Sequence, residues 1–310
     1  MATLKELASK PEIFASGHRA CAGCLGAVGI HEVLRATQKD VVLGFATGCM
    51  EVISTIYPYS SWEVPYIHVA FENAAAVVSG AEAAYRSFKK QGKIDKDKEI
   101  NFIAFGGDGG TYDIGFQSLS GAMERGHNML YVCYNNQAYM NTGVQRSSAT
   151  PMGANTATDP MGKESVGKKQ FPKDLTEIMV AHGIPYVAQA AVHHWKDVTA
   201  KVEKALSIKG PKFINLLAPC TLGWKFSAEE GLEVSRLAAD TCLWPLYEVE
   251  NGVYKLNYKP KEKKPISEWV AGQGRFKHLS KTEDGKKMVN DFQSEIDVKW
   301  NRLLSLSEKK

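Results

Sequence analysis

Several features that mark whole classes of protein are missing from this sequence of 310 residues. No apolar run reaches the roughly 18 residues that a membrane-spanning helix needs. The N-terminal segment carries Lys5, Glu6, Lys10 and Glu12 and has no apolar stretch of the kind found in secretory signals. The 44% hydrophobic and 23% charged residues are typical of a globular protein, and no internal repeat is visible. We therefore expect a cytoplasmic chain with a sizeable core and no membrane contact.

Most of the chain carries no excess of positive charge. The segment Tyr258–Lys310 holds 13 basic and 8 acidic residues, whereas the remainder holds 25 basic and 26 acidic residues. The lysines of the segment Lys259–Lys264 are interrupted by Pro260 and Glu262, which is typical of a solvated connector rather than of a polyanion-binding stripe. We therefore predict no nucleic-acid partner.

Common catalytic signatures are also missing. The sequence contains no HExxH and no GxSxG, and its eight histidines show no metal-ligand spacing. Six cysteines are present, at positions 21, 24, 49, 133, 220 and 242. Because disulfides are uncommon in cytoplasmic proteins, metal binding or redox chemistry is the better explanation for some of them.

What the sequence does contain is an alternation of short apolar segments with amphipathic ones. Nearly continuous apolar strands that alternate with helices are typical of a parallel sheet covered on both faces, so the sequence predicts a doubly wound, mostly parallel α/β fold. The predicted strands are Val41–Ala46, Asn101–Gly106, Met129–Tyr134, Tyr186–Ala191 and Lys212–Leu217. The predicted helices are Gly26–Ala36, Asn73–Lys90, Asp113–Arg125, Lys173–His182 and Trp195–Leu206.

Two segments depart from this alternation. Gly143–Phe171 is rich in Ser, Thr, Gly and Pro and has neither period, and loops of that length are usually functional. After Leu246 a hairpin (Tyr247–Tyr258), the connector and a helix (Lys286–Leu306) are expected. We therefore divide the chain into a cofactor-binding α/β domain, residues 1–246, and a C-terminal arm, residues 247–310, that packs on partner subunits.

The motif Gly107-Asp108-Gly109-Gly110 directly follows a predicted strand. Glycines allow backbone N–H groups to approach a phosphate closely, and Asp108 offers a hard oxygen to a divalent cation. Asn136 follows the next strand, so both side chains lie at one edge of the sheet, and Mg²⁺ prefers such oxygen ligands. A Gly-Asp-Gly motif followed by a strand-end Asn-Asn pair is the fingerprint of thiamine diphosphate binding, although isolated turns also produce such residues.

Four cysteines form a second candidate site. Cys21 and Cys24 have the spacing that grips one metal ion or cluster, and Cys49 and Cys220 each follow a predicted strand. Strand ends are where cofactors bind in open α/β sheets, so Gly48 and Cys49 are expected beside the cofactor. By count, four thiolates suit Zn²⁺ or a [4Fe–4S] cluster equally well. Cys133 and Cys242 are interpreted as small buried apolar residues.

Seven segments together carry a resemblance to a known family: Gly17–Cys21, Ala46–Cys49, Pro65–Asn73, Phe105–Gly110, Ala138–Ser147, Ala181–Tyr186 and Trp244–Glu248. The sequence resembles the β subunits of the pyruvate:ferredoxin oxidoreductase family, the multi-subunit 2-oxoacid:ferredoxin oxidoreductases. The resemblance covers nearly the whole chain, including the C-terminal arm.

This resemblance implies roles for individual residues. Cys21, Cys24, Cys49 and Cys220 correspond to the four ligands of a [4Fe–4S] cluster. Mg²⁺ would be held by Asp108, by the Asn136 side chain and by the Ala138 carbonyl. Asn141 corresponds to an active-site amide that points at the substrate. The resemblance also implies an α subunit that supplies the activating glutamate, a cluster-carrying ferredoxin-like subunit, and ferredoxin as electron acceptor.

The sequence departs from the family at the metal motif, where relatives usually have Tyr-Asp-Asn-Glu and this chain has Tyr134-Asn135-Asn136-Gln137. At an effective dielectric of about 20, one like charge some 8 Å away disfavours a substrate carboxylate by roughly 2 kcal/mol. The loss of two acids favours a more anionic substrate, so we expect oxalate, oxidised to CO₂ without CoA, over pyruvate converted to acetyl-CoA. The alternatives are a non-oxidative thiamine decarboxylase without a cluster and a zinc-stapled, non-enzymatic binding module.

Overall fold

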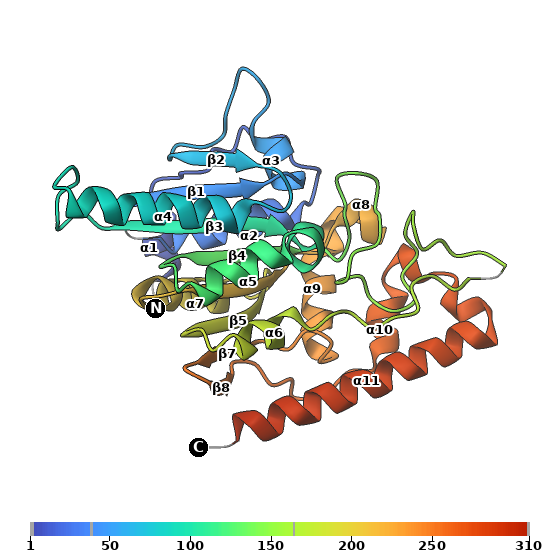
Figure 1. The fold of residues 1–310 in the computed structure, drawn as a ribbon. Helices are drawn as coiled ribbons and strands as arrows, with labels where there is room; N and C mark the ends of the chain where they lie inside the picture. Colours follow the sequence, from blue (N-terminus) through green and yellow to red (C-terminus); the bar gives the residue numbers. More distant parts are fainter. Residues whose placement is uncertain (1–2, 38–39, 164, 309–310) are drawn as a thin grey trace.

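A computed structural model describes residues 3–37, 40–163 and 165–308. Within these ranges eight strands form one sheet in the order β2-β1-β3-β4-β6-β5-β7-β8 (Figure 1). The strands are β1 Asp40–Ala46, β2 Tyr66–Val69, β3 Ile100–Gly107, β4 Leu130–Asn135, β5 Tyr186–Ala191, β6 Lys212–Leu217, β7 Tyr247–Glu250 and β8 Val253–Leu256. In this order the first six strands, β2, β1, β3, β4, β6 and β5, run parallel to one another. Strand β7 pairs antiparallel with β5, and β8 pairs antiparallel with β7. The predicted doubly wound, mostly parallel α/β fold is confirmed.

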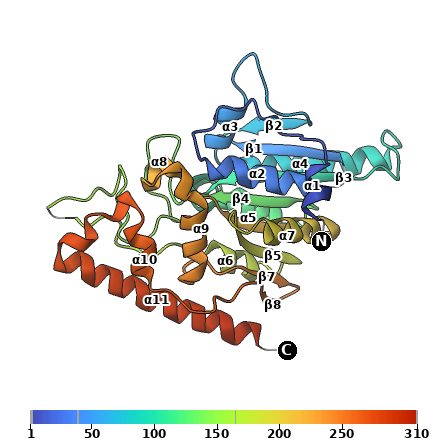
Figure 2. The ribbon, with the colours of Figure 1, turned by 180° about the vertical axis from the view of Figure 1, so that it is seen from behind.

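Helices cover both faces of this sheet. They are α1 Leu4–Ala8, α2 Leu25–Arg35, α3 Cys49–Ser54, α4 Ala74–Lys90, α5 Phe116–Glu124, α6 Leu175–Ala181, α7 Trp195–Ser207, α8 Thr221–Trp224, α9 Gly231–Asp240, α10 Ile266–Ala271 and α11 Glu283–Ser307. Four short helical turns are η1 Gly109–Ile114, η2 Ala228–Glu230, η3 Gly274–Phe276 and η4 Leu279–Lys281. Figures 1 and 2 show α4 and α5 on one face and α2 and α7 on the other.

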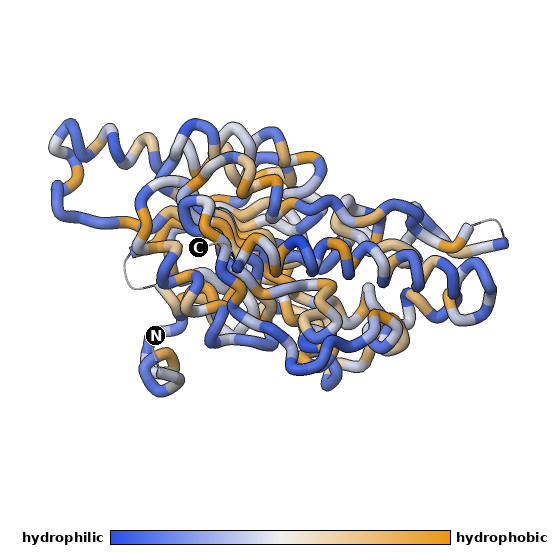
Figure 3. Tube along the Cα trace, turned by 90° about the horizontal axis from the view of Figure 1, so that it is seen from below, coloured by the Kyte–Doolittle hydropathy of each residue, from blue (hydrophilic) through white to orange (hydrophobic). Residues whose placement is uncertain are grey.

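The buried strands explain this arrangement. β4 and β6 are buried along their whole length, which requires helices on both sides of the sheet. Because side chains alternate along a strand, Ala104 belongs to the apolar cluster under α4 and α5, and Phe105 belongs to the cluster under α2 and α7. Figure 3 shows the hydrophobic residues gathered in the middle of the molecule, along the strands.

Two elements differ from the sequence-based expectations. The edge strand β2 was not predicted, because it has four residues and the side chains of Ile67 and His68 are exposed. The helix expected from Asp113 begins instead as a π-helical turn, η1, and continues as α5 from Phe116. In η1 the Gly115 N–H donates to the Gly110 carbonyl at 2.7 Å, and such wide turns occur frequently at functional sites.

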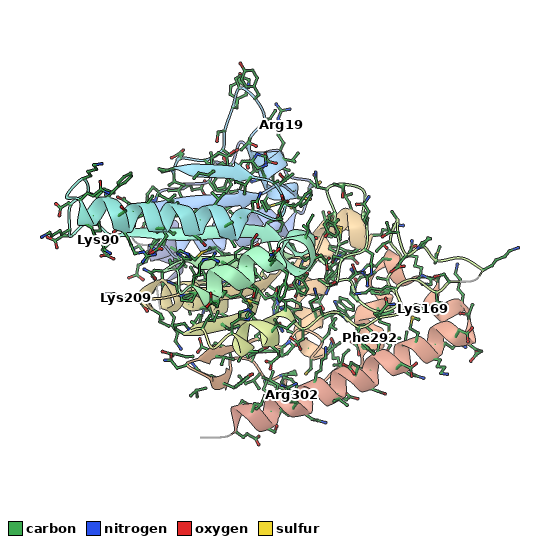
Figure 4. The ribbon with its side chains drawn as sticks, in the orientation of Figure 1. Arg19, Lys90, Lys169, Lys209, Phe292 and Arg302 are labelled. Carbon is green, nitrogen blue, oxygen red and sulfur yellow. The ribbon has the colours of Figure 1, made fainter. Side chains whose placement is uncertain are left out.

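The C-terminal part of the chain contains the expected hairpin and final helix. The hairpin β7–β8 pairs with β5 and so widens the main sheet. Helix α11 runs along one side of the molecule, where the rings of Phe292 and Phe171 have centroids 6.1 Å apart (Figure 4). The division at residue 246 stays a prediction. Among the helices of the described ranges, none combines the length and the apolarity needed to cross a bilayer.

Candidate functional site

The predicted site residues follow four neighbouring strands of the sheet. Cys49 comes shortly after β1, Asp108 directly after β3, Asn136 directly after β4, and Cys220 shortly after β6. These strands are parallel neighbours, so their carboxyl ends lie at one edge. This edge is where open α/β sheets bind their ligands.

A cleft at this edge collects most of the predicted residues. Its lining includes Gly48, Cys49, Gly107, Gly109, Gly110, Asn136, Ala138 and Asn141, together with Thr47, Phe71, Tyr134, Tyr139, Met140 and Thr142. A larger pocket lies beneath α11 and is lined by Phe171, Phe292 and Trp300, but by none of the predicted site residues. Size alone would therefore select a cavity that holds none of the predicted site residues.

The glycines of the cleft leave no room for side chains. A Cβ atom on Gly109 would lie 2.4 Å from the ring of Tyr139, and one on Gly110 would lie 2.9 Å from the Phe71 carbonyl oxygen. The Tyr139 hydroxyl donates to the Gly109 carbonyl at 2.9 Å, which fixes the start of η1. The backbone of this turn can therefore approach an anion as closely as a phosphate-binding loop requires.

Asp108 is completely buried beneath these glycines. Its Oδ2 accepts a hydrogen bond from the Ser147 hydroxyl at 2.5 Å, and its Oδ1 accepts one from the Asn136 N–H at 3.2 Å. Burial raises the pKa of Asp108 to about 7, although both hydrogen bonds act in the opposite direction. A nearby cation would lower this pKa and favour the ionised carboxylate.

The turn after β4 is held by several hydrogen bonds. Gln137, with a φ of 65°, donates its N–H to Asn135 Oδ1 at 3.0 Å, and its carbonyl accepts from Thr150 Oγ1 at 2.7 Å. The Trp224 ring N–H donates to the Asn136 carbonyl at 2.7 Å. This backbone is thereby fixed with the Asn136 side chain directed at Asp108.

The Asn136 side chain meets two further oxygens. One terminal atom of its amide lies 2.9 Å from both the Ala138 carbonyl oxygen and Asp108 Oδ1. As nitrogen, this atom donates two hydrogen bonds. As oxygen, it would join a carboxylate oxygen and a carbonyl oxygen, which are the ligand types that Mg²⁺ prefers. The donor set therefore fits Mg²⁺.

Tyr134 provides a further sign of a missing partner. Its hydroxyl is buried and makes no hydrogen bond of normal geometry within the described ranges, although the Met50 backbone lies near it. The hydroxyl packs against two glycines of the cleft: an added Cβ atom would lie 2.7 Å from it on Gly48 and 3.3 Å from it on Gly107. Tyr134 itself lines the cleft. Buried polar atoms normally have partners, so this hydroxyl is a candidate ligand contact.

Three of the four predicted cluster cysteines stand at helix starts. Cys24 precedes α2, Cys49 is the first residue of α3, and Cys220 precedes α8. The Gly223 N–H donates to the Cys220 sulfur at 3.3 Å. Burial raises the pKa of Cys24 and Cys220, and the backbone N–H groups at these helix starts act in the opposite direction.

The cysteine-bearing segments lie side by side. The Thr221 hydroxyl, next to Cys220, donates to the carbonyl of Ala22, between Cys21 and Cys24, at 3.4 Å. Burial and the charge of Cys220 raise the pKa of Cys49 to about 12, and the charges of Cys24 and Cys21 act in the same direction. Cys21, Cys24 and Cys220 therefore lie within electrostatic reach of Cys49.

The thiols have not converged on one point. Across residues 3–37, 40–163 and 165–308, no group of three or more His, Cys, Asp or Glu has the geometry to hold a metal ion. Cys21 is exposed, whereas Cys24, Cys49 and Cys220 are half-buried. Cys133 and Cys242 are buried in the core, as predicted.

Other residues of the site escaped the sequence analysis. Ser147 was noted only as part of a family motif, and Arg275 and Trp224 were given no role in the site. Arg275 donates to Gln137 Oε1 at 2.7 Å. Asn135 donates to the Tyr112 hydroxyl at 2.9 Å. Neither Asn135 nor Gln137 lines the cleft, although Gln137 lies between two residues that do, Asn136 and Ala138.

Comparisons with known proteins agree with this geometry. Residues 46–216 match the family described as "Thiamine pyrophosphate enzyme, C-terminal TPP binding domain". The chain is 49% identical to pyruvate synthase subunit PorB of Thermotoga maritima, over 98% of this chain and 96% of that one. It is 53% identical to PorB of Methanocaldococcus jannaschii, over 95% and 97%.

The chain belongs to the β subunits of the 2-oxoacid:ferredoxin oxidoreductase family. The family prediction is confirmed, and the match to the thiamine pyrophosphate domain runs from the end of β1 to β6, which spans the cleft. As a β subunit, the chain functions in a multi-subunit enzyme. The same family includes the ketoisovalerate oxidoreductase subunit VorB of Pyrococcus furiosus, which is 42% identical over 96% of this chain and 94% of that one.

The fold of this β subunit has a counterpart among solved structures. A 2-oxoglutarate:ferredoxin oxidoreductase from Magnetococcus marinus superimposes with a TM-score of 0.53 over 71% of this chain and 77% of that chain. At 20% sequence identity, this likeness concerns the fold alone.

Proposed function

We propose that this β subunit binds thiamine diphosphate through Mg²⁺ and carries a [4Fe–4S] cluster, in a complex that oxidises pyruvate to acetyl-CoA and CO₂ and passes the electrons to ferredoxin. The observation that carries the proposal is the meeting of the oxygen donors and the cysteines at one edge of the sheet. Pyruvate is chosen over oxalate because the relatives that match almost end to end are pyruvate synthase subunits.

The chain's own residues have distinct tasks in this proposal. Asp108, Asn136 and the Ala138 carbonyl hold Mg²⁺, and the backbone of Gly109 and Gly110 receives the diphosphate. When bound, thiamine diphosphate supplies the carbanion that adds to a 2-oxo acid and accepts the electrons left as CO₂ departs. Asn141, in the lining of the cleft, orients the substrate.

Electron exit is assigned to the four cysteines. Cys21, Cys24, Cys49 and Cys220 would hold a [4Fe–4S] cluster, and the N–H groups at the starts of α2, α3 and α8 would donate to its sulfurs. Such hydrogen bonds and the partial burial of the site tune a cluster's potential. Zn²⁺ satisfies the same count of thiolates, so metal analysis separates the two.

Partner subunits complete the proposed enzyme. No residue of this chain is assigned the role of activating glutamate, which we place on the α subunit. We assign onward electron transfer to a cluster-carrying ferredoxin-like subunit and to ferredoxin. We therefore predict that the chain alone, with cofactor and cluster present, has no turnover. Turnover by the isolated chain would contradict this assignment.

The test is an assay of the complex, purified without oxygen, with a viologen dye. We expect fast dye reduction with pyruvate that depends on CoA, together with iron and sulfide in the preparation. Turnover of oxalate without CoA, and none of pyruvate, would overturn the choice of substrate. Zinc in place of iron and sulfide would overturn the oxidoreductase mechanism itself.

A further inference from the structure

A buried arginine of the C-terminal arm lies between the two halves of the site. Arg275, in η3, is 2% exposed. Its guanidinium carbon lies 3.8 Å from the centre of the Trp224 ring, 4.9 Å from that of Phe276 and 5.3 Å from that of Trp269. An aromatic cage of this kind excludes water and holds the charge in a region of low dielectric.

The hydrogen-bond partners of this arginine are neutral. Its Nη2 donates to Gln137 Oε1 at 2.7 Å, and its Nε donates to Gln273 Oε1 at 2.9 Å. No carboxylate of the described ranges is seen to form an ion pair with it. A guanidinium remains charged even when buried, so this site carries one positive charge that no carboxylate contacts directly, although Asp108 lies within electrostatic reach.

Two residues that Arg275 contacts connect it to the two proposed cofactor sites. Gln137 directly follows the Mg²⁺ ligand Asn136, and Trp224 donates to the Asn136 carbonyl at 2.7 Å. Trp224 also ends α8, the helix of four residues that starts after Cys220. Burial lowers the pKa of Arg275 well below its usual value, and the charges of Cys220 and Asp108 counteract this.

We propose that Arg275 is the buried counter-charge of the electron-transfer path and that it raises the reduction potential of the cluster held by Cys220. This inference rests on the proposed function. Reduction adds one electron to a cluster that four thiolates already make negative, so a nearby fixed cation stabilises the reduced form more than the oxidised form. No proton transfer is needed.

The size of the effect follows from the path. Four residues of helix advance about 6 Å, the Trp224 side chain adds about 4 Å, and the guanidinium lies 3.8 Å beyond the ring, so the arginine lies within roughly 14 Å of the Cys220 backbone. At an effective dielectric of about 20, a unit charge at that distance changes an equilibrium by roughly tenfold. For a one-electron couple, tenfold corresponds to about 59 mV.

The test measures the midpoint potential of the cluster in the full-length chain, reconstituted anaerobically, by a titration followed by electron paramagnetic resonance. Arg275→Met removes the charge, and Gln137→Glu neutralises it with a carboxylate while the arginine stays in place. Both variants are expected to lower the midpoint by about 59 mV, a tenfold change in the reduction equilibrium. Arg275→Lys, which keeps the charge, is expected to shift the midpoint less.

Arg302→Met is the matched control, because it removes an exposed arginine of the same arm at the far end of α11 (Figure 4). It should leave the midpoint unchanged. If Gln137→Glu keeps its iron and sulfide but has the wild-type midpoint, the inference is overturned while the proposed function stands. If the wild-type chain binds no cluster at all, the proposed function fails instead.

Discussion

The oxygen donors and the sulfur donors of this β subunit lie at one edge of the same sheet, but the chain holds them differently. Asp108 is fully buried and fixed by two hydrogen bonds, and the turn after β4 is fixed by several more. The cysteines lie on loops and helix starts, where Cys21 is exposed and the thiols do not converge.

We infer from this difference that the fold prepares the oxygen side of the proposed site in advance. The oxygen donors follow strands β3 and β4 directly, so the pairing of the sheet determines where they lie. The thiols repel one another once ionised, and their final arrangement depends on the group that they bind. Three experiments test this contrast, from the largest expected effect to the smallest.

The largest effect is expected at the cysteines. Changing Cys21, Cys24, Cys49 or Cys220 to Ser should abolish the iron–sulfur absorbance, because each removes one of four ligands. Cys133→Ser and Cys242→Ser are the controls, since both residues are buried in the core. Visible absorbance and iron content are the measurements. Loss of the cluster in Cys133→Ser alone would show that the ligand set is wrong.

The next effect concerns Asp108. Asp108→Ala removes an anionic ligand from the Mg²⁺–diphosphate site, which should cost about 1.5–3 kcal/mol, or roughly 10–150-fold in cofactor affinity. Titration of thiamine diphosphate with Mg²⁺ into the chain measures this. The control is Asp40→Ala, at the start of β1 and therefore at the opposite edge. Equal affinities in the two variants would exclude Asp108 from the site.

The smallest effect tests whether the oxygen side is prepared in advance. Ser147→Ala removes the hydroxyl that orients Asp108, and losing such a supporting contact should weaken Mg²⁺-dependent binding by about tenfold. Ser148→Ala is a close control, because the neighbouring hydroxyl donates to Asp113 instead. Titration at several Mg²⁺ concentrations distinguishes the two. If both variants bind as tightly as the wild type, the buried hydrogen bond does not prepare the metal ligand.

Some of this site could be predicted from the sequence because of where its residues stand. Asp108, Asn136 and Cys220 each follow an apolar strand, and parallel strands end at one edge, so a one-dimensional pattern predicts their meeting. The five central strands were found for the same reason, since continuous apolar runs of that length are typical of buried parallel strands.

Other residues carry no such signal. Ser147 reaches Asp108 across 39 residues, and Arg275 reaches Gln137 across 138 residues, both from segments without a hydrophobic period. The direction of Gln137 was also beyond prediction, because its φ of 65° interrupts the alternation of side chains that β4 establishes.

The contact between the Ala22 carbonyl and the Thr221 hydroxyl joins segments that are 199 residues apart. At about 5–20 residues per second, ribosomal synthesis separates the first cysteines from the last by roughly 10–40 seconds. During that interval the nascent chain contains Cys21 and Cys24 but not yet Cys220. If the four cysteines hold one cluster, its complete insertion must follow translation of Cys220, and until then the nascent chain exposes free thiols to oxygen and to competing metals.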